Sequence, residues 1–292
     1  MITDIESATP ALCRLQLGSE LRQLRQDAGL NSRQVVRKLL WSPSKLTRLE
    51  TGENATVEPS DVMALCQIYQ ADEETCELLK GYAAVTKTRR DWWQSPEYRQ
   101  VITPGFKAFL GLEATASALH DYESEFVPGL LQTEDYVRVI YQRAHQGLSD
   151  DEIDRMVAVR MNRQAILHRE SPLKLTAIIN EAVLHRQVGG TAVMRAQLAH
   201  IAEATSAPNV RVQVVPFKLG HHPGMNGSFM ILQFRDPVAL KPIIYFENMA
   251  DSWVSRRNVD VERFGEAFTD LQALAPGPQE SLSMIKKAIR EL

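Results

Sequence analysis

Residues 29–52, which read GLNSRQVVRKLLWSPSKLTRLETG, carry the start and stop signals of two short helices with only a tight turn between them. Gly29 ends the preceding helix, because glycine enters the left-handed region without a Cβ penalty. Asn31, followed by a Gln three residues later, has the spacing of a capping box. Ser42–Pro43 predicts the N-terminus of the second helix and Gly52 its C-terminus. The signals agree on two helices in immediate succession.

Further amphipathic helices precede and follow this pair. Apolar residues from Leu17 to Ala28 are spaced four, three and four residues apart, so they line one helix face. Residues 1–16 lack clear periodicity, and we expect a loose arm or a first helical turn there. The sequence therefore predicts a compact all-α domain of five short helices, at about 17–28, 31–40, 43–51, 60–69 and 72–88.

Charges are unevenly distributed along the chain, although the formal net charge is only −3. Between Arg14 and Arg48 there are eight Lys and Arg residues against two acidic residues, whereas residues 50–77 hold eight Asp and Glu and no Lys or Arg. Phosphate binding requires a local basic surface, which a whole-chain charge can hide. Clustering of like charges on solvated faces is the alternative explanation.

The helix at 43–51 has a polar face with the chemistry of a DNA reader. With Leu46 and Leu49 facing the core, the helical step of about 100° per residue turns the polar residues between them outward. Arginine is the best bidentate reader of guanine, while Ser and Thr donate to bases or phosphates. The N-terminus of the preceding helix offers backbone N–H groups to a phosphate.

The same run aligns without a gap to the helix-turn-helix pattern of Xre-type regulators, which include the phage repressors, and the resemblance covers about residues 17–82. In that family the third helix lies in the major groove, which implies that Pro43 and its polar neighbours face the groove. The resemblance also implies a buried ion pair between Arg25 and Glu50. The candidate DNA contacts are Ser32, Arg33, Arg37, Ser42, Pro43, Ser44, Lys45, Thr47 and Arg48.

Three residues depart from the family pattern. Ser32 stands where the family usually carries a Gln, so one common clamp on base and backbone is absent or shorter. Leu40 replaces the turn glycine, and either the turn geometry differs or the helix runs slightly longer. Pro43 has no side-chain donor and can touch only a thymine methyl or the backbone. The alternative is a five-helix bundle that uses this face to contact a protein.

A domain boundary is expected near residue 90, where charges, paired tryptophans and prolines interrupt the periodicity. We expect a mainly α chain, with a lambda-repressor-like domain at 1–90 followed by a larger α+β domain at 91–292 that contains a small mixed sheet. Glycine and histidine residues at 218–227 predict a long, flexible loop. Helices are expected at about 106–125, 133–146, 150–170, 192–205, 261–271 and 282–292, and strands at 173–179, 209–217, 228–234 and 242–248.

Four blocks of the second half, at 127–142, 160–167, 179–189 and 209–217, resemble one large family of actinobacterial regulators. In these proteins an Xre helix-turn-helix is joined to a C-terminal domain of unknown function. The resemblance implies a DNA-binding transcription factor, often encoded beside a small partner protein and sometimes described as antitoxin-like. It implies little about ligand chemistry.

The sequence contains no motif that is typical of an enzyme. Glu181 and His185 are one helical turn apart, which suits an acid–base pair, but a surface ion pair is the more ordinary interpretation. His221 and His222 lie in a glycine-rich loop without a third ligand at metal spacing. No serine elbow, P-loop or dinucleotide fingerprint is present. We expect no catalysis, no metal and no cofactor.

Aromatic residues and two arginines of the second domain are candidates for a ligand pocket. The aromatics would form apolar walls and the arginines would meet an anion. In the alternative interpretation the aromatics belong to the core and the arginines pair with nearby acids. The candidate pocket residues are Trp92, Trp93, Tyr122, Arg160, Arg163 and Tyr245.

The whole sequence of 292 residues predicts a soluble, cytoplasmic protein. No apolar run reaches the roughly 20 residues of a membrane span, and the cysteines have no ligand spacing. The leading hypothesis is a sequence-specific regulator that binds double-stranded operator DNA, as a homodimer because such regulators bind two half-sites. The C-terminal domain would sense a ligand or a small protein partner, or dimerise. The alternative is an antitoxin-like module that sequesters a small protein encoded nearby.

Overall fold

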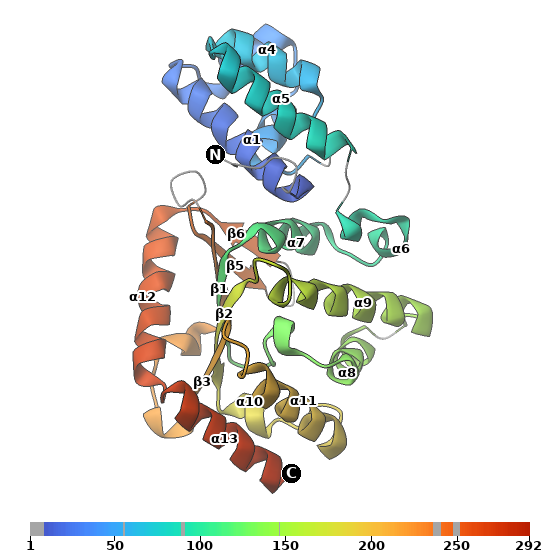
Figure 1. The fold of residues 1–292 in the computed structure, drawn as a ribbon, viewed down its shortest axis with the longest axis vertical. Helices are drawn as coiled ribbons and strands as arrows, with labels where there is room; N and C mark the ends of the chain where they lie inside the picture. Colours follow the sequence, from blue (N-terminus) through green and yellow to red (C-terminus); the bar gives the residue numbers. More distant parts are fainter. Residues whose placement is uncertain (1–8, 55, 89–90, 146, 236–240, 248–251) are drawn as a thin grey trace. The chain divides into compact units, whose positions relative to one another are not determined.

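The computed structural model describes residues 9–54, 56–88, 91–145, 147–235, 241–247 and 252–292. Two compact units divide the chain, one built on residues 1–95 with 110–115 and 236–241, the other on 96–109, 116–235 and 242–292 (Figure 1). Residues 1–8 of the expected arm, the expected boundary at residue 90, and the ends of predicted elements at 146 and 248 lie outside the described residues.

Five α-helices form the first unit, as the sequence predicts. They are α1 (Pro10–Asp27), α2 (Ser32–Leu39), α3 (Pro43–Thr51), α4 (Pro59–Tyr69) and α5 (Glu73–Thr88). Apolar side chains from all five helices are buried in one core, because each helix has a single apolar stripe to cover. Its members include Leu17, Leu21, Val35, Leu46, Leu49, Val62, Leu65, Leu79 and Tyr82.

The first helix begins earlier than the sequence pattern indicated. Thr9 is its N-cap, with Oγ1 accepting from the backbone N–H of Leu12 at 3.2 Å, and Pro10 occupies the first helical position. Ala11 and Cys13 are buried, so the first turns of α1 pack into the protein and residues 10–16 are not a loose arm. The stretch that looked like an unstructured break contains two short elements, η1 (Trp92–Gln94) and α6 (Pro96–Arg99).

A six-stranded mixed sheet organises the second unit and confirms the predicted α+β class. Its order is β3-β2-β1-β4-β5-β6, in which β1, β2 and β3 are parallel and the remaining neighbours are antiparallel. The strands are β1 (Ala118–Glu123), β2 (Lys174–Asn180), β3 (Val210–Val215), β4 (Phe229–Gln233), β5 (Ile243–Glu247) and β6 (Ser252–Ser255).

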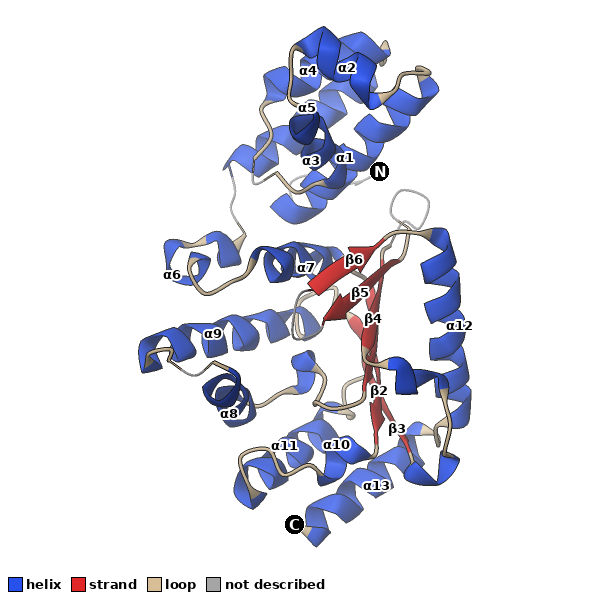
Figure 2. Ribbon diagram, turned by 180° about the vertical axis from the view of Figure 1, so that it is seen from behind, coloured by secondary structure: helices blue, strands red, loops and turns tan. Residues whose placement is uncertain are grey.

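Helices cover both faces of this sheet. One face carries α12 (Asn258–Leu274), and the other carries α8 (Glu134–Ala144), α9 (Asp150–Arg163) and α11 (Thr191–Ala204) (Figure 2). Because successive side chains of a strand point to opposite faces, Tyr122 and its even-numbered neighbours meet α12. The His120 ring accordingly stacks on Phe268 of α12, with centroids 4.5 Å apart. The remaining helices are α7 (Pro104–Thr115), α10 (Ala182–His185) and α13 (Pro278–Glu291).

The predicted helix at 106–125 was wrong in its second half. The helix α7 ends at Thr115, and residues 118–123 form β1, a central strand paired with β2 on one side and β4 on the other. Ala, Leu and Glu in this segment favour a helix locally. Pairing along both edges and burial of Leu119 and Tyr122 outweigh that preference, because strand formation depends strongly on tertiary context.

Smaller corrections concern element ends and loops. The helix predicted to reach residue 170 stops at Arg163 and continues as the 3-10 turn η3 (Gln164–Leu167). The expected loop at 218–227 contains two 3-10 turns, η4 (Phe217–Leu219) and η5 (Pro223–Asn226), and β6 had not been predicted. Strands β2 to β5 and the two C-terminal helices lie where the sequence placed them.

The segment between α12 and α13 is tied to β3 by buried polar side chains. Gln213 Nε2 donates to the carbonyls of Gln272 and Pro276, at 3.2 and 3.0 Å. Ser281 Oγ accepts from the Val214 N–H at 3.0 Å and donates to the Pro276 carbonyl at 3.0 Å. Since both side chains are almost fully buried, these bonds fix the start of α13 against the strand.

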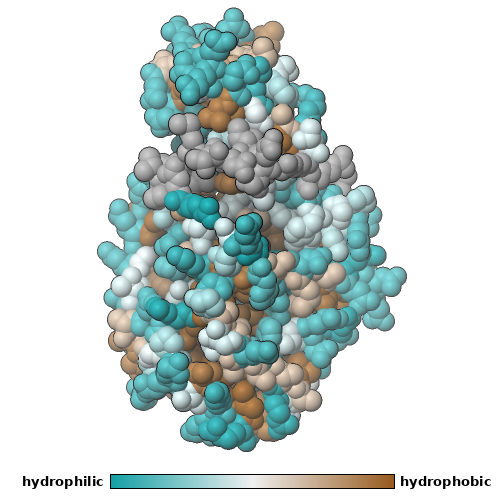
Figure 3. Space-filling model, in the orientation of Figure 1, coloured by the Kyte–Doolittle hydropathy of each residue, from teal (hydrophilic) through white to brown (hydrophobic). Residues whose placement is uncertain are grey.

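None of the helices in the described part of the chain combines the length and the apolar composition that crossing a bilayer requires. On the face shown in Figure 3, hydrophilic residues predominate, and the apolar ones form small, dispersed patches. Isolated apolar residues of this kind are normal on a protein surface.

Candidate nucleic-acid interface

Helices α2 and α3 form a helix–turn–helix whose ends are set by local capping. Asn31 Oδ1 accepts from the Gln34 N–H at 3.0 Å, and Gln34 Oε1 accepts from the Asn31 N–H at 2.8 Å, which completes the capping box. Ser42 Oγ accepts from the Lys45 N–H at 3.3 Å, and Gly52 ends α3 with φ 74°. Each cap satisfies backbone groups that a helix end leaves without partners.

Leu40 settles the geometry of the turn between the two helices. Its φ of 55° and ψ of 35° are those of the left-handed conformation, so it occupies the backbone position for which glycine is the usual residue. The helix α2 therefore ends at Leu39 and does not run longer. The side chain of Leu40 is 92% exposed, so the strain of the left-handed backbone is not offset by burial there.

The inner side of α3 is anchored to the core and to α1. Leu46 and Leu49 are each 1% exposed. The Arg25 guanidinium forms a bidentate pair with Glu50, with Nε–Oε1 2.6 Å and Nη2–Oε2 2.9 Å, and also donates to the Leu30 carbonyl at 3.0 Å. The hydrogen bonds to Glu50 raise the pKa of Arg25. This pair fixes α3 relative to α1 and to the start of α2.

Gly18 lets α1 and α3 approach closely. A Cβ at this position would lie 2.5 Å from the Leu49 carbonyl oxygen and 2.8 Å from that of Glu50. Both are backbone atoms and cannot rotate away, so α1 needs glycine here. The core, the ion pair and this contact together hold α3 rigidly.

The outer side of α3 is exposed and polar, as the sequence indicated. Ser44, Thr47 and Arg48 are all exposed. The Ser44 and Ser42 hydroxyls are 3.1 Å apart, and the Thr47 hydroxyl donates to the Pro43 carbonyl at 3.1 Å, which leaves its oxygen able to accept. No described residue forms an ion pair with Arg48, so its guanidinium is available to a ligand.

Lys45 differs from Arg48 because it already has partners. Its Nζ lies 2.8 Å from Oδ2 of Asp61, in the first turn of α4, and 3.9 Å from the centroid of the Trp41 ring. The Lys45 and Asp61 side chains are only 35% and 23% exposed. Contact with a DNA phosphate therefore competes with the Asp61 carboxylate.

Helix α2 adds a second exposed basic region, with Ser32 and Arg33 in its first turn and Arg37 in its last. Ser32, Arg33 and Arg37 are exposed, and the two arginines form no ion pair with any described residue. The first-turn N–H groups of α2 carry partial positive charge, as at every helix N-terminus. Anions are favoured at such a position when basic side chains stand beside it.

Each of the two units is matched by a family model. The model described as "Helix-turn-helix domain" matches residues 16–79, and the model described as "Domain of unknown function (DUF5753)" matches residues 106–287, more than half of the chain. The chain belongs to the DUF5753 family. No curated protein and no solved structure matches it. The helix-turn-helix domain suggests a DNA-binding regulator.

Within the DUF5753 domain, the structure does not bring the candidate pocket residues Tyr122 and Tyr245 together. Tyr122 is paired with Phe229 and lies on the α12 face of the sheet. Tyr245 lies on the opposite face, where its ring centroid is 4.1 Å from that of Phe109. Both tyrosines are almost fully buried, so they belong to the core. Trp92 and Trp93 pack edge to face with each other in the first unit.

The two candidate arginines of the DUF5753 domain are part of its interior. Arg160 Nε donates to the Tyr141 hydroxyl at 2.9 Å, and the guanidinium carbon of Arg163 lies 5.0 Å from the centroid of the Phe109 ring. Burial lowers the pKa of Arg160, but Tyr141 and the carboxylates of Glu247 and Glu123 raise it by more. The charge of Arg160 is therefore compensated from within the chain.

The histidines singled out in the sequence have structural roles in the DUF5753 domain. His185 Nε2 is 3.7 Å from Glu181 Oε1, while Glu181 Oε2 accepts from the Phe217 N–H at 2.6 Å. His222 is buried, with Nε2 3.4 Å from Asn180 Nδ2. Within the described ranges, no group of three or more His, Cys, Asp or Glu side chains is arranged to hold a metal ion.

Sequence reasoning missed Gly18, Trp41 and Asp61. A glycine inside an amphipathic helix is a signal of close packing, and Gly18 carries that signal. Trp41 was not among the predicted site residues, yet its ring lies against Lys45. Asp61 has no distinguishing pattern, because its relation to Lys45 arises only when α4 packs beside α3.

Proposed function

We propose that this chain is a sequence-specific transcriptional regulator of Xre type, whose helix α3 enters the major groove of DNA. The observation that carries the proposal is Arg48, an exposed arginine with no ion-pair partner among the described residues. It lies on a helix that Leu46, Leu49 and the Arg25–Glu50 pair hold in place. Bidentate donation to guanine O6 and N7 is the contact that such an arginine makes best.

The surrounding residues divide by chemistry into base and phosphate contacts. Pro43, Ser44 and Thr47 share the outer face of α3 with Arg48. There the Ser44 hydroxyl donates to a base, the Thr47 oxygen accepts from one, and the proline ring meets a thymine methyl. Phosphate contacts fix the register on the duplex. These come from Lys45, from Ser32, Arg33 and Ser42 at the starts of the two helices, and from Arg37 in the last turn of α2.

The regulator acts as a homodimer in this proposal. One α3 helix reads only a few base pairs, and two-fold related helices read two half-sites about 34 Å apart. Mass measurement of the complex with a palindromic site tests this point, because two chains per site are expected. One chain per full site would contradict the dimer without contradicting groove binding.

Selection of bound sequences from random duplex DNA, followed by titration across a salt series, tests the central proposal. Affinity should fall as salt rises, because phosphate contacts release counterions. Arg48→Ala should cost about 1–3 kcal/mol and relax the preference at one base position. Arg22→Ala, at an exposed arginine of α1, is the matched control. If salt has no effect, or if Arg48→Ala and Lys45→Ala bind like the parent chain, the proposal is wrong.

A further inference from the structure

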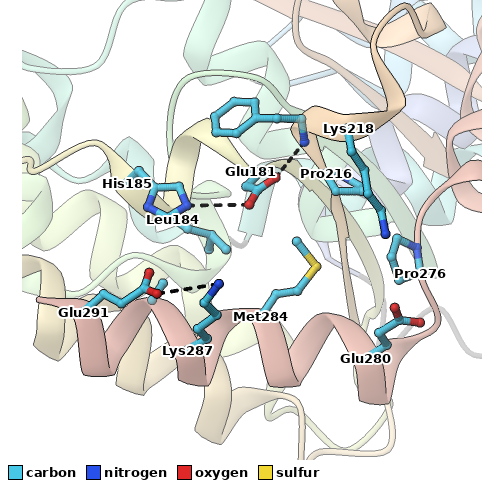
Figure 4. A pocket seen from close by; sticks show the side chains of 12 residues that line it. Glu181, Leu184, His185, Pro216, Lys218, Pro276, Glu280, Met284, Lys287 and Glu291 are labelled. Carbon is cyan, nitrogen blue, oxygen red and sulfur yellow. Dashed lines mark hydrogen bonds and ion pairs between the residues drawn. The ribbon is translucent and has the colours of Figure 1, made fainter.

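A cavity of about 430 Å³ lies at the end of the DUF5753 sheet, where β2 and β3 terminate. Its walls come from three separate segments, at 181–185, 216–218 and 276–291 (Figure 4). Glu181 directly follows β2 and Pro216 directly follows β3, so the cavity stands at the carboxyl ends of two parallel strands. Ligands of α/β sheets bind at this position, and the volume is within the range of about 300–1,000 Å³ seen for ligand pockets.

Hydrogen bonds from three segments hold the cavity walls in place. Glu181 accepts from the Phe217 N–H at 2.6 Å, which fixes the turn η4 that carries Lys218. On the other side, Gln213 and Ser281 tie the start of α13 to β3 through the Pro276 carbonyl, each at 3.0 Å. A site formed in this way needs little ordering when a ligand enters, so less binding free energy is lost.

The lining combines an apolar floor with six ionisable side chains, four of them in two pairs and two in single positions. Leu184, Pro216, Met284 and Ala288 provide the floor. Glu181 lies 3.7 Å from His185 and accepts from the Phe217 N–H, and Lys287 faces Glu291 at 3.6 Å, so these side chains already have partners within the chain.

Lys218 and Glu280 are the exceptions among the charges of the lining. Both are exposed, and neither forms an ion pair with any described residue. In Figure 4 they lie on the side of Pro276, whereas His185 and Glu291 lie on the opposite side with Met284 between the two groups. One cation and one anion are thus available at the same side of an apolar cavity.

We propose that this cavity binds a zwitterionic α-amino acid with a large apolar side chain. Lys218 takes the ligand carboxylate, Glu280 takes the ligand ammonium group, and the ligand side chain covers Met284 and Leu184. A polyanion such as a nucleotide is disfavoured, because the lining has three carboxylates against two lysines. An uncharged apolar molecule would leave the charges of Lys218 and Glu280 without partners, whereas a zwitterion pairs with both.

Titration of the full chain with L-leucine, L-methionine, L-phenylalanine and L-tryptophan tests the proposal. The readouts are calorimetry and the Met284 methyl resonance, assigned with Met284→Leu. Saturable binding with a shift of that resonance is expected. The N-acetylated and the carboxamide forms of the same amino acids lack one charge each and should bind about tenfold more weakly or not at all. Glycine has no side chain to cover the floor and should bind weakly too.

Variants identify the site. Lys218→Ala and Glu280→Gln should each weaken binding by about tenfold or more, and their exposed positions leave the fold intact. Lys286→Ala, at an exposed lysine of α13 outside the lining, should bind like the parent chain. The proposal is overturned if no zwitterionic amino acid saturates the protein, if blocked forms bind equally well, or if both lining variants keep full affinity. Those outcomes leave the DNA-binding proposal untouched, since DNA is absent from the measurement.

Discussion

The Lys45 ammonium of α3 lies 2.8 Å from the Asp61 carboxylate of α4 and also contacts the ring of Trp41. A lysine on a proposed DNA-reading helix is therefore partly neutralised by an acid on the neighbouring helix. An acid so close to the proposed interface also repels phosphate. In the proposed complex, DNA affinity depends on the balance between Lys45 and Asp61 and not on the basic residues alone.

Asp61→Asn should tighten DNA binding by a few-fold, because it releases Lys45 for phosphate and removes one negative charge. The salt dependence of affinity should steepen by about one phosphate contact. Fluorescence anisotropy at several salt concentrations measures both quantities. Glu74→Gln makes the same charge change at an exposed site of α5 and is the control. Equal gains in DNA affinity from both variants would show that affinity depends only on net charge and not on the contact between Asp61 and Lys45.

Breaking the ion pair between Arg25 and Glu50 should destabilise the first unit. Their side chains are only 11% and 9% exposed, so removing one partner leaves a poorly solvated charge. Arg25→Ala or Glu50→Ala should each lower the free energy of unfolding by about 2–4 kcal/mol. Replacing both residues with apolar ones should lower the free energy of unfolding by less than the sum of the two single effects. Urea denaturation followed by circular dichroism measures this, and single losses under about 1 kcal/mol would contradict the structural role.

Gly18→Ala should destabilise the helix-turn-helix domain by about 1–3 kcal/mol, because the new methyl group meets backbone oxygens of α3. Gly265→Ala is the matched control, since α12 has open space around that glycine. There alanine should be neutral or stabilising by about 0.5–1 kcal/mol, as expected for a helix interior. Opposite signs at the two positions in thermal or urea unfolding support the close contact. A stabilising Gly18→Ala would refute it.

Stability should decrease as the pH falls below about 6.5, in part because of His120. Burial lowers the pKa of His120 beneath its ordinary value of 6.5. Between 6.5 and the lower folded value, the unfolded chain binds a proton that the folded chain does not, so protonation favours unfolding. One such group contributes a slope of at most about 1.4 kcal/mol per pH unit.

His120→Gln removes this titration and should flatten the pH dependence of the free energy of unfolding below pH 6.5. The pKa of His222 is also lowered, by burial and by the charge of His221, so some slope should persist in the variant. In the double variant that also carries His222→Gln, the pH dependence of the free energy of unfolding should be flatter again. An unchanged slope in both variants would show that these rings are not the groups responsible.

The helix–turn–helix was predictable because its signals are local. Asn31, Ser42 and Gly52 act on backbone groups within a few residues, so the sequence reveals the helix ends directly. The strand at 118–123 could not be recognised, since its local composition favours a helix and only its partners on both sides make it a strand. Tertiary context decides such a segment.

The candidate sites also differ in whether local sequence could predict them. The outward face of α3 follows from helical periodicity, and the exposure of Ser44, Thr47 and Arg48 agrees with it. The aromatic pocket was expected from composition, but Tyr122 and Tyr245 lie on opposite faces of one sheet. The cavity that does form is lined by segments almost 100 residues apart, at 181–185 and 276–291, and no local pattern connects them.

The hydrogen bond between Val214 and Ser281 also limits how copies of this protein can associate. Along the outer edge of β3, the Val210 N–H donates to the Ala207 carbonyl and the Val214 N–H donates to Ser281 Oγ. An exposed edge strand is a template for pairing with a foreign strand, and natural sheets avoid this by occupying or covering the edge. Two N–H groups of the β3 edge are therefore already occupied, and a foreign strand that pairs along the whole edge would first have to displace Ser281 and the start of α13.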